Sequence, residues 1–355
     1  MKIAIDVSPL QSGHKVRGVG FYLKHLKNAL EKNYSEHTYC FFNDRAALPN
    51  DIDIIHYPYF DPFFVTLPLI KKYPTVVTVH DLTPLVFPEH FPAGIKGKLR
   101  WQIQKRNLQN IDMIIADSEA SRQDIITIAK VQESKIAVAY LAAGDEFRHI
   151  ELQKPLAKRI QDKYKLPDKF ILYVGDVTWN KNLPNLIQAA AKSKILLVMV
   201  GKSLVQTDFD KSNPWNKDLV QVQMLVQNNP YVVRLGFVPT DDLVHLYNMA
   251  TCFIMPSQYE GFGLPIIEAM QSGCPVITTK NGSLPEVAGD AALYTDGNTS
   301  DAIAERINQI LNDDQMQKRL SVKGIARAKE FSWKKTASQT IKVYEKVIEK
   351  NKRQA

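Results

Sequence analysis

The chain has 355 residues, more than one ordinary hydrophobic core accommodates, so its length predicts about two domains. A hydrophobic content of 45% and a charged content of 23% are typical of soluble globular proteins, and no apolar run approaches the roughly 20 residues that span a bilayer. The net charge of +8 leaves nucleic acid, an anionic membrane surface and phosphorylated ligands as partner classes. Because the sequence has no zinc finger, RRM or similar signature, we expect no nucleic-acid partner.

The N-terminus and the cysteines indicate the compartment. Residues Met1 to Val7 predict a strand rather than a signal peptide, because Asp6 interrupts the apolar run and no small-residue cleavage site follows. The three cysteines lie far apart at positions 40, 252 and 274, without the spacing of disulfides or metal ligands. We therefore expect a cytoplasmic protein with reduced thiols.

Short β-rich runs recur through the first half of the chain, with helical patterns between several of them. The expected strands are Ile3–Val7, Tyr39–Phe42, Asp53–Tyr57, Val76–Val79, Met113–Ala116 and Ile136–Tyr140. The expected helices include Gly20–Lys32 and Ser118–Lys130. Alternation of helices with strands that are apolar on both faces predicts a parallel sheet covered on both sides.

A basic helix is expected from Lys96 to Arg106, where positive charges alternate with the apolar residues Ile95, Leu99, Trp101 and Ile103. A solvated helix face is the simpler interpretation. Contact with an anionic bilayer or a lipid-linked acceptor is the alternative, which would place the protein peripherally on the inner membrane face. The aromatic segment Tyr57–Phe64 is compatible with the same contact and equally with buried packing.

The second half repeats the alternation after a polar, basic stretch from about residue 150 to 169, which we expect to connect two domains. The expected strands are Phe170–Val174, Ile195–Val200, Tyr231–Leu235, Cys252–Met255 and Pro275–Thr278. The expected helices are Asn182–Ala191, Asp241–Met249, Pro265–Ser272, Ser300–Leu311 and a final one from Trp333 to about Lys350. The pattern predicts two doubly wound α/β domains, residues 1–165 and 166–332, that bind ligands beyond the carboxyl ends of their strands.

The most informative segment runs from Glu260 to Glu268 and places two glycines, a proline and two carboxylates between a strand and a helix. Pro265 suits the first helical position, and Gly273 suits the helix stop. Amides around Phe262 to Leu264 would point outward at the positive end of the helix, where anions bind. Together with carboxylates that accept hydroxyl protons, this combination predicts a sugar nucleotide as ligand.

The same segment resembles the E-x7-E motif of retaining glycosyltransferases of family four, with Glu260 and Glu268 at the two motif positions. The resemblance extends from Tyr173 to about Lys346 and more loosely over the N-terminal half. It implies the GT-B fold, in which two Rossmann-like domains face each other across a cleft. It also implies that the first domain takes the acceptor, the second takes the nucleotide sugar, and the segment 333–355 crosses back to the first domain.

The resemblance assigns roles to residues of the second domain. Glu260 would bind the transferred sugar together with the amides of Phe262, Gly263 and Leu264. Glu268 would bind the ribose hydroxyls of the donor.

The turn after the strand ending at Tyr173-Val174-Gly175 would hold the diphosphate, with Lys181 stabilising the leaving group and Gly175 lining the site. Asn180 stands where the family usually has an arginine, so another cation such as Arg17 or Lys202 is a candidate to compensate. One missing charge-assisted hydrogen bond removes about 1.5–3 kcal/mol.

In the first domain the resemblance implies that His80, at the tip of the strand Val76–Val79, contacts the transferred sugar, whereas His80 alone would more often be structural. Gly18 and Gly20 match a glycine loop that approaches the donor phosphates. That loop is no dinucleotide fingerprint, because Leu23 occupies the place of the third glycine.

No metal and no other cofactor are expected. Asp51-Ile52-Asp53 and Asp208-Phe209-Asp210 have the D-x-D form of metal-dependent glycosyltransferases, but such triplets are common by chance. Lys181 and the helix N-termini would take over the role of the metal ion.

The sequence thus predicts a retaining transferase that moves a hexosyl unit from GDP-mannose or a UDP-sugar to a hydroxyl acceptor, a growing glycan or lipid-linked saccharide. By resemblance the transfer is front-face, and a covalent intermediate on Glu260 is the minority mechanism. Two alternatives stay open: a sugar-nucleotide epimerase, and a non-catalytic partner subunit that binds nucleotide sugars, which the loss of arginine at position 180 makes conceivable.

Overall fold

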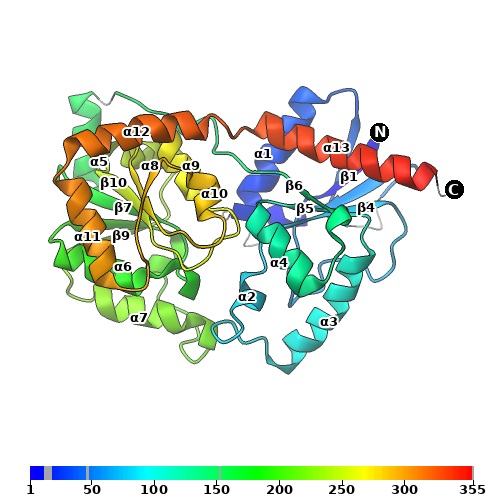
Figure 1. The fold of residues 1–355 in the computed structure, drawn as a ribbon, viewed down its shortest axis with the longest axis horizontal. Helices are drawn as coiled ribbons and strands as arrows, with labels where there is room; N and C mark the ends of the chain where they lie inside the picture. Colours follow the sequence, from blue (N-terminus) through cyan, green and yellow to red (C-terminus); the bar gives the residue numbers. More distant parts are fainter. Residues whose placement is uncertain (12–17, 45–47, 152, 354–355) are drawn as a thin grey trace. The chain divides into compact units, whose positions relative to one another are not determined.

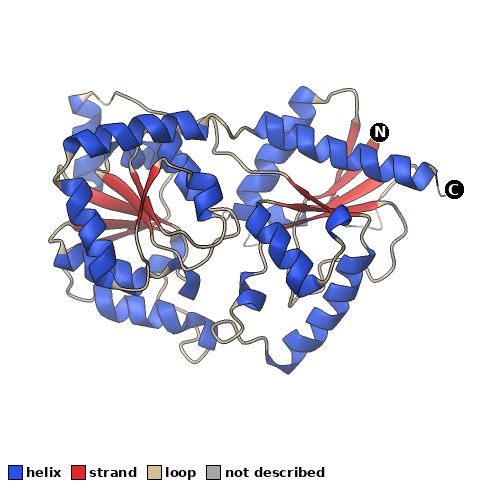
Figure 2. Ribbon diagram, in the orientation of Figure 1, coloured by secondary structure: helices blue, strands red, loops and turns tan. Residues whose placement is uncertain are grey.

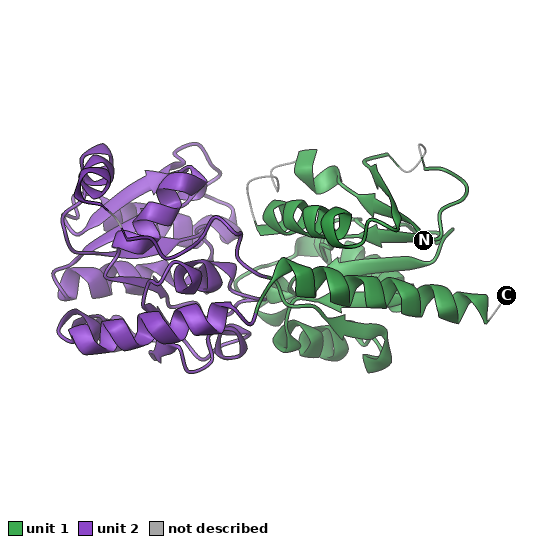
Figure 3. Ribbon diagram, turned by 90° about the horizontal axis from the view of Figure 1, so that it is seen from above, with its two compact units in different colours: residues 1–141, 331–355 green, residues 142–330 purple. Residues whose placement is uncertain are grey.

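The computed structural model describes residues 1–11, 18–44, 48–151 and 153–353 (Figure 1). The chain divides into two compact units: unit 1 comprises Met1–Leu141 with Phe331–Ala355, and unit 2 comprises Ala142–Glu330 (Figure 3). The division falls at residues 141/142 and 330/331, whereas the sequence placed the domain boundaries at 165/166 and 332/333.

Unit 1 is built on a six-stranded sheet, parallel throughout, with strand order β2-β1-β3-β4-β5-β6. Its strands are β1 Lys2–Asp6, β2 Thr38–Phe42, β3 Ile54–Tyr57, β4 Thr75–Val79, β5 Met113–Ala116 and β6 Ile136–Val138. Its helices are α1 Gly18–Asn33, α2 Thr83–Val86, α3 Gly94–Asn110, α4 Glu119–Ala129 and α13 Trp333–Lys352. Helices cover both faces of the sheet (Figure 2), which is why β3, β4 and β5 are buried along their whole length.

The final helix α13 belongs to unit 1 although it follows unit 2 in the sequence. It packs against α1 and the sheet strands β4 and β5. Thr336 Oγ1 donates to the carbonyl of Tyr140 at 2.6 Å, and the Tyr140 ring meets the Phe331 ring edge-on.

Unit 2 repeats the architecture with a second six-stranded parallel sheet of order β12-β11-β10-β7-β8-β9. Its strands are β7 Phe170–Val174, β8 Leu196–Val200, β9 Val232–Gly236, β10 Cys252–Met255, β11 Val276–Thr278 and β12 Ala292–Tyr294. Its helices are α5 Lys154–Tyr164, α6 Leu183–Lys192, α7 Lys217–Val226, α8 Thr240–Met249, α9 Leu264–Gln271, α10 Leu284–Ala288, α11 Ser300–Leu311 and α12 Asp314–Ala328.

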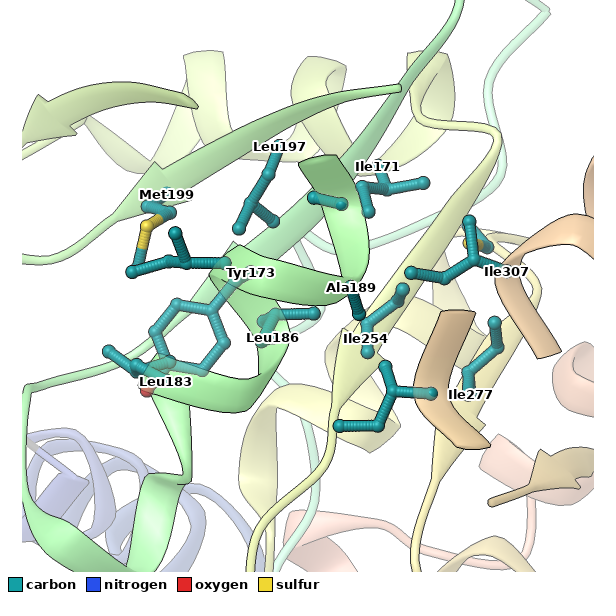
Figure 4. Close-up of a cluster of buried hydrophobic side chains, with 14 of the residues drawn as sticks. Ile171, Tyr173, Leu183, Leu186, Ala189, Leu197, Met199, Ile254, Ile277 and Ile307 are labelled. Atoms are coloured by element: carbon teal, nitrogen blue, oxygen red, sulfur yellow. The ribbon is translucent and has the colours of Figure 1, made fainter. Parts of the chain in front are cut away.

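The core under α6, α7 and α11 shows why the sequence alternation is informative. Ile171 and Tyr173 of β7, with Leu197 and Met199 of β8, point to the same face and are fully buried there (Figure 4). Every second strand residue reaches this core because side chains alternate across a strand. The intervening residues face the opposite side, where α9 packs against α12.

The segment expected to connect the domains contains helix α5 instead. Tyr164 and Lys163 of α5 both donate to Asp242 of α8, at 2.6 and 2.5 Å, and Ile160 is buried. Residues 144–150 are also held to unit 2, since Gln271 Nε2 donates to the carbonyls of Gly144 and Phe147. These contacts explain why the unit begins at residue 142.

Candidate active site

The topology of unit 2 marks where a ligand should bind. From β7 the chain proceeds outward to β8 and β9, and then returns to β10 on the other side of β7. In doubly wound sheets such a reversal opens a crevice beyond the carboxyl ends of the two strands. The segments that leave β7 and β10 carry Gly175, Lys181 and Glu260, so the residues expected from the sequence gather at this point.

The turn from β10 into α9 depends on glycine. Gly263 caps α9 with a φ of 89°, and a Cβ there would lie 2.9 Å from Leu284 Cδ2. Pro265 is the second residue of the helix rather than the first, and Gly273 follows its end with a φ of 75°. In the first turn Pro265 has no N–H and Ile266 N donates to the Gly263 carbonyl at 2.9 Å, so the amide of Leu264 is the one left to the positive helix end.

Beside this helix end lies a bidentate ion pair. Lys181 Nζ donates to Oε1 and Oε2 of Glu260 at 2.7 and 2.8 Å. The Lys181 side chain is 20% exposed and that of Glu260 is 9% exposed, so solvent reaches the ammonium more readily than the carboxylate. The structure therefore brings together two of the predicted catalytic residues, 79 positions apart.

Asparagine side chains tie the two segments that carry this pair. Asn182 adopts a left-handed φ of 58°, and its Nδ2 donates to the carbonyls of Pro256 and Gly297 at 3.0 and 2.6 Å. Asn180 Nδ2 donates to the carbonyl of Tyr259 at 2.9 Å, and the Asn180 carbonyl accepts from Gln258 N at 2.7 Å. These bonds fix the distance between Lys181 and Glu260.

The contacts of Asn180 show what this residue does in place of the arginine that the family usually has. Its side chain is buried and also accepts a hydrogen bond from Thr178 Oγ1 at 2.7 Å, so it holds the loop rather than presenting a charge. Of the cations considered as replacements, Arg17 lies outside the described residues. Lys202 is exposed and follows Gly201, which packs so closely on Gly175 that a Cβ at 201 would lie 2.0 Å from the Gly175 carbonyl oxygen.

The backbone of Glu260 is held independently of its side chain. Its carbonyl accepts from Ser283 N at 3.2 Å and from Ser283 Oγ at 3.0 Å. Gly282 has a φ of 56°, and a Cβ there would lie 2.7 Å from the Glu260 carbonyl oxygen. A glycine at position 282 is therefore required for this close approach.

Glu268 lies within α9 in a different environment. Its carboxylate is 7% exposed and accepts from Tyr247 OH at 3.0 Å. Burial raises the pKa of Glu268 to about 7, while the Tyr247 hydroxyl acts in the opposite direction and Glu146 adds to the rise. Glu260 is thus neutralised by an ammonium group, whereas Glu268 has a neutral phenol as its partner.

In unit 1, His80 follows β4, and both of its ring nitrogens are in contact with protein atoms. Nδ1 lies 2.6 Å from Asp117 Oδ2 and Nε2 lies 3.0 Å from the Pro58 carbonyl oxygen. Burial lowers the pKa of His80, but Asp117 outweighs this effect and raises it. Asp81 caps the following loop by accepting from Thr83 N at 2.8 Å.

A buried polar chain runs beside His80. His56 Nδ1 lies 2.7 Å from Tyr344 OH and Nε2 lies 2.8 Å from Thr78 Oγ1, which is 2.9 Å from Tyr22 OH. The Tyr22 ring meets the His80 ring edge-on at 4.9 Å. Burial lowers the pKa of His56 to about 3, so the ring is neutral.

The predicted glycine loop is only partly described. Gly18 is the first residue of α1 and Gly20 is buried in its first turn, and a Cβ at Gly18 would have nothing within 4 Å. Arg17, which precedes them, lies outside the described residues. Asp117 and Tyr247 are the contacts that sequence reasoning missed. Asp117 directly follows β5, and that position was the available signal.

The two D-x-D triplets have structural partners. Asp51 pairs with Lys2 Nζ and Asp53 accepts from Lys2 N at 2.7 Å, while Asp210 accepts from Ser212 N at 2.9 Å. Within the described ranges, no three His, Cys, Asp or Glu side chains are grouped as a metal site. Within the same ranges, no helix has the length and apolar character needed to cross a bilayer.

Two family models match the chain. Residues 157–327 match "Glycosyl transferases group 1" and residues 27–142 match "Glycosyltransferase Family 4". The O-antigen chain mannosyltransferase B of Escherichia coli is 33% identical over 296 residues, covering 82% of this chain and 75% of that relative.

Solved structures are similar over nearly the whole chain. Sucrose-phosphate synthase of Thermosynechococcus elongatus superposes with a TM-score of 0.75 at 20% identity, covering 98% of this chain and 99% of the other. HepE of Anabaena in complex with UDP-glucose gives 0.70 at 19% identity, covering 99% and 100%. These likenesses show the fold. The chain is therefore a glycosyltransferase with the GT-B fold, and it belongs to the group 1 glycosyl transferases of family four.

Proposed function

We propose that the protein transfers a hexosyl unit, with retention of anomeric configuration, from a nucleoside-diphosphate sugar bound by unit 2 to a hydroxyl of a glycan or lipid-linked saccharide. The Lys181–Glu260 pair at the N-terminus of α9 carries this proposal. It combines an ammonium group, the positive end of a helix and a carboxylate in one place, which matches a diphosphate joined to a sugar.

The ammonium of Lys181 is the proposed stabiliser of the leaving diphosphate. Its Nζ lies 2.7 and 2.8 Å from the two carboxylate oxygens of Glu260 and neutralises them. A bound donor offers phosphate oxygens to the same ammonium and sugar hydroxyls to the freed carboxylate. As the glycosidic bond breaks, negative charge grows on the diphosphate, so the interaction with Lys181 strengthens in the transition state. We propose that this cation and the α9 amides make a metal ion unnecessary.

We propose front-face transfer rather than a covalent intermediate, because the carboxylate that Lys181 releases accepts from the sugar hydroxyls. In front-face transfer the acceptor hydroxyl attacks from the side of the leaving group, whose phosphate oxygen takes the proton. Glu260 then binds the sugar and need not act as a nucleophile.

We propose GDP-mannose as the first donor to test and UDP-sugars as the second. The similarity to an O-antigen chain mannosyltransferase supports the former, and the fold shared with HepE, whose structure holds UDP-glucose, supports the latter. A membrane-bound glycan acceptor would require the protein to work at the cytoplasmic face of the membrane.

The test is incubation of the purified protein with GDP-mannose or UDP-glucose, with and without an acceptor glycan, followed by proton NMR. We expect product only with acceptor, an unchanged anomeric configuration, and turnover that persists in EDTA. An inverted product would refute retention, and loss of turnover in EDTA would refute metal independence. Conversion of donor alone would identify an epimerase, and tight donor binding without turnover on any acceptor would identify a binding subunit.

A further inference from the structure

Helix α3 has two apolar faces, and only one of them packs on unit 1. The buried residues of the helix are Gly97, Gln104 and Leu108. Ile95, Leu99 and Ile103 recur every four residues and so share another face, which at 3.6 residues per turn lies roughly opposite. Their exposed fractions are 89%, 64% and 37%. Packing within unit 1 accounts for the face with Gly97, Gln104 and Leu108. It does not account for the apolar residues on the exposed face.

The loop between β3 and β4 packs on α3 at the side of Gln104, roughly opposite this exposed face. Gln104 Nε2 donates to Thr66 Oγ1 at 2.7 Å and to the Asp61 carbonyl at 3.2 Å, which holds the loop on the helix. Phe64, 62% exposed, places its ring centroid 5.6 Å from the guanidinium carbon of Arg100. We define the α3 patch as Ile95, Leu99 and Ile103.

Positive charge surrounds the α3 patch. Helix α3 contains Lys96, Lys98, Arg100, Lys105 and Arg106 and no acidic residue. Among the described residues, Lys96, Lys98 and Arg106 have no carboxylate within salt-bridge distance. Exposed aliphatic side chains on the same helix as uncompensated cations match a bilayer interface, where chains insert below the headgroups and cations meet phosphates. Single-stranded nucleic acid would instead favour exposed aromatic rings for stacking, and α3 exposes isoleucine and leucine.

We propose that the α3 patch docks unit 1 on an anionic phospholipid surface, with Ile95 and Leu99 inserted at the headgroup level and the lysines of α3 against lipid phosphates. This docking goes beyond the transfer reaction and does not depend on the donor site, which is built from unit 2. It would give the enzyme access to an acceptor held in the membrane. Attraction by the lysines falls off within a Debye length, so the binding should weaken as salt rises.

The experiment is sedimentation of the full-length protein with vesicles of phosphatidylcholine alone or mixed equally with phosphatidylglycerol. We expect binding to the mixed vesicles, release by high salt, and little binding to phosphatidylcholine. The variant Ile95→Ser with Leu99→Ser should weaken partitioning at least about tenfold, because two inserted side chains are lost. The variant Lys96→Glu with Lys98→Glu should weaken it by at least a similar factor, because attraction becomes repulsion.

A matched control removes equally exposed side chains elsewhere. Met224→Ser with Val322→Ser changes residues of unit 2 that are 63% and 69% exposed, and should leave vesicle binding unchanged. All variants should transfer sugar to a soluble acceptor at the wild-type rate, so a failure of docking is distinguishable from a failure of the proposed transferase. Absent binding to anionic vesicles, or equal losses in control and α3 variants, would overturn the proposal. Two other results would also overturn it. One is a dimer of the protein that Ile95→Ser with Leu99→Ser abolishes, and the other is binding to single-stranded RNA, in place of vesicles, that the same variant abolishes.

Discussion

Replacing Glu268 with glutamine should stabilise the unliganded protein at alkaline pH while weakening donor binding. Burial raises the pKa of Glu268 from 4.5 to about 7. Because the folded pKa lies above the unfolded one, stability is unaffected below pH 4.5, falls as pH rises toward 7, and stays reduced above it. A difference of 2.5 units corresponds to about 3 kcal/mol. Glu268→Gln keeps the shape and an acceptor for Tyr247 OH but cannot ionise.

The assay is calorimetric and denaturant unfolding at pH 4 and pH 9. We expect the free energy of unfolding of unit 2 to rise by about 3 kcal/mol at pH 9 and to change little at pH 4. Glu305→Gln, a 69% exposed carboxylate of α11, is the control and should change stability at neither pH. Donor affinity of Glu268→Gln should fall about tenfold, since one charged acceptor is lost. If Glu268→Gln were only as stable as the wild type at pH 9, burial would not disfavour the charged form of Glu268.

Three further predictions concern neighbouring groups. Lys181→Ala should lower turnover about 10²–10³-fold. It should also lower the free energy of unfolding by about 2 kcal/mol, because Glu260 loses its counterion. Adding Glu260→Gln should restore stability but not turnover, and normal turnover of Lys181→Ala in steady-state assays would exclude Lys181 from the mechanism. Gly282→Ala should destabilise unit 2 in thermal melts through contact with the Glu260 carbonyl, whereas Gly94→Ala, at a φ of 61° with open space, should suffer only the backbone strain. The pKa of His56 in the folded protein is about 3, so the free energy of unfolding should fall as pH drops below 6.5, by about 2 kcal/mol at pH 5. His56→Gln should flatten this dependence of stability on pH, measured by urea titrations. An unchanged dependence on pH in the variant would contradict a neutral buried ring.

Local periodicity made most of the fold predictable. The strands of both sheets, apart from β12, and the basic helix α3 were located because their apolar residues repeat within a few positions. Helix α5 was missed because Pro155 and a run of polar residues suggested a connection. Proline is tolerated in the first helical turn, and α5 begins at Lys154 with Pro155 as its second residue. Its apolar face is narrow, with Ile160 its only residue buried in unit 2.

Pairings between distant residues could not be predicted in the same way. The sequence identified Lys181 and Glu260 separately, but their contact depends on β7 and β10 being neighbours, which follows from the return of the chain after β9. Likewise the sequence did not reveal the partner of His80, which the structure pairs with Asp117, 37 positions away. Strand order in a parallel sheet decides such contacts, and a one-dimensional pattern does not encode it.

The two carboxylates of the E-x7-E motif are distinguished by their partners, and from this difference we infer separate roles for them. Glu260 is compensated before any ligand arrives, because Lys181 contacts both of its oxygens. Glu268 accepts from the neutral hydroxyl of Tyr247, so its buried negative charge is costly without further donors. Ribose hydroxyls that donate to Glu268 would relieve that cost, and the energy of this contact is available on donor binding. The Lys181–Glu260 pair must instead open to engage diphosphate and sugar, so its charges are best used when the glycosidic bond breaks. We therefore propose that Glu268 acts in donor binding and the Lys181–Glu260 pair in the chemical step.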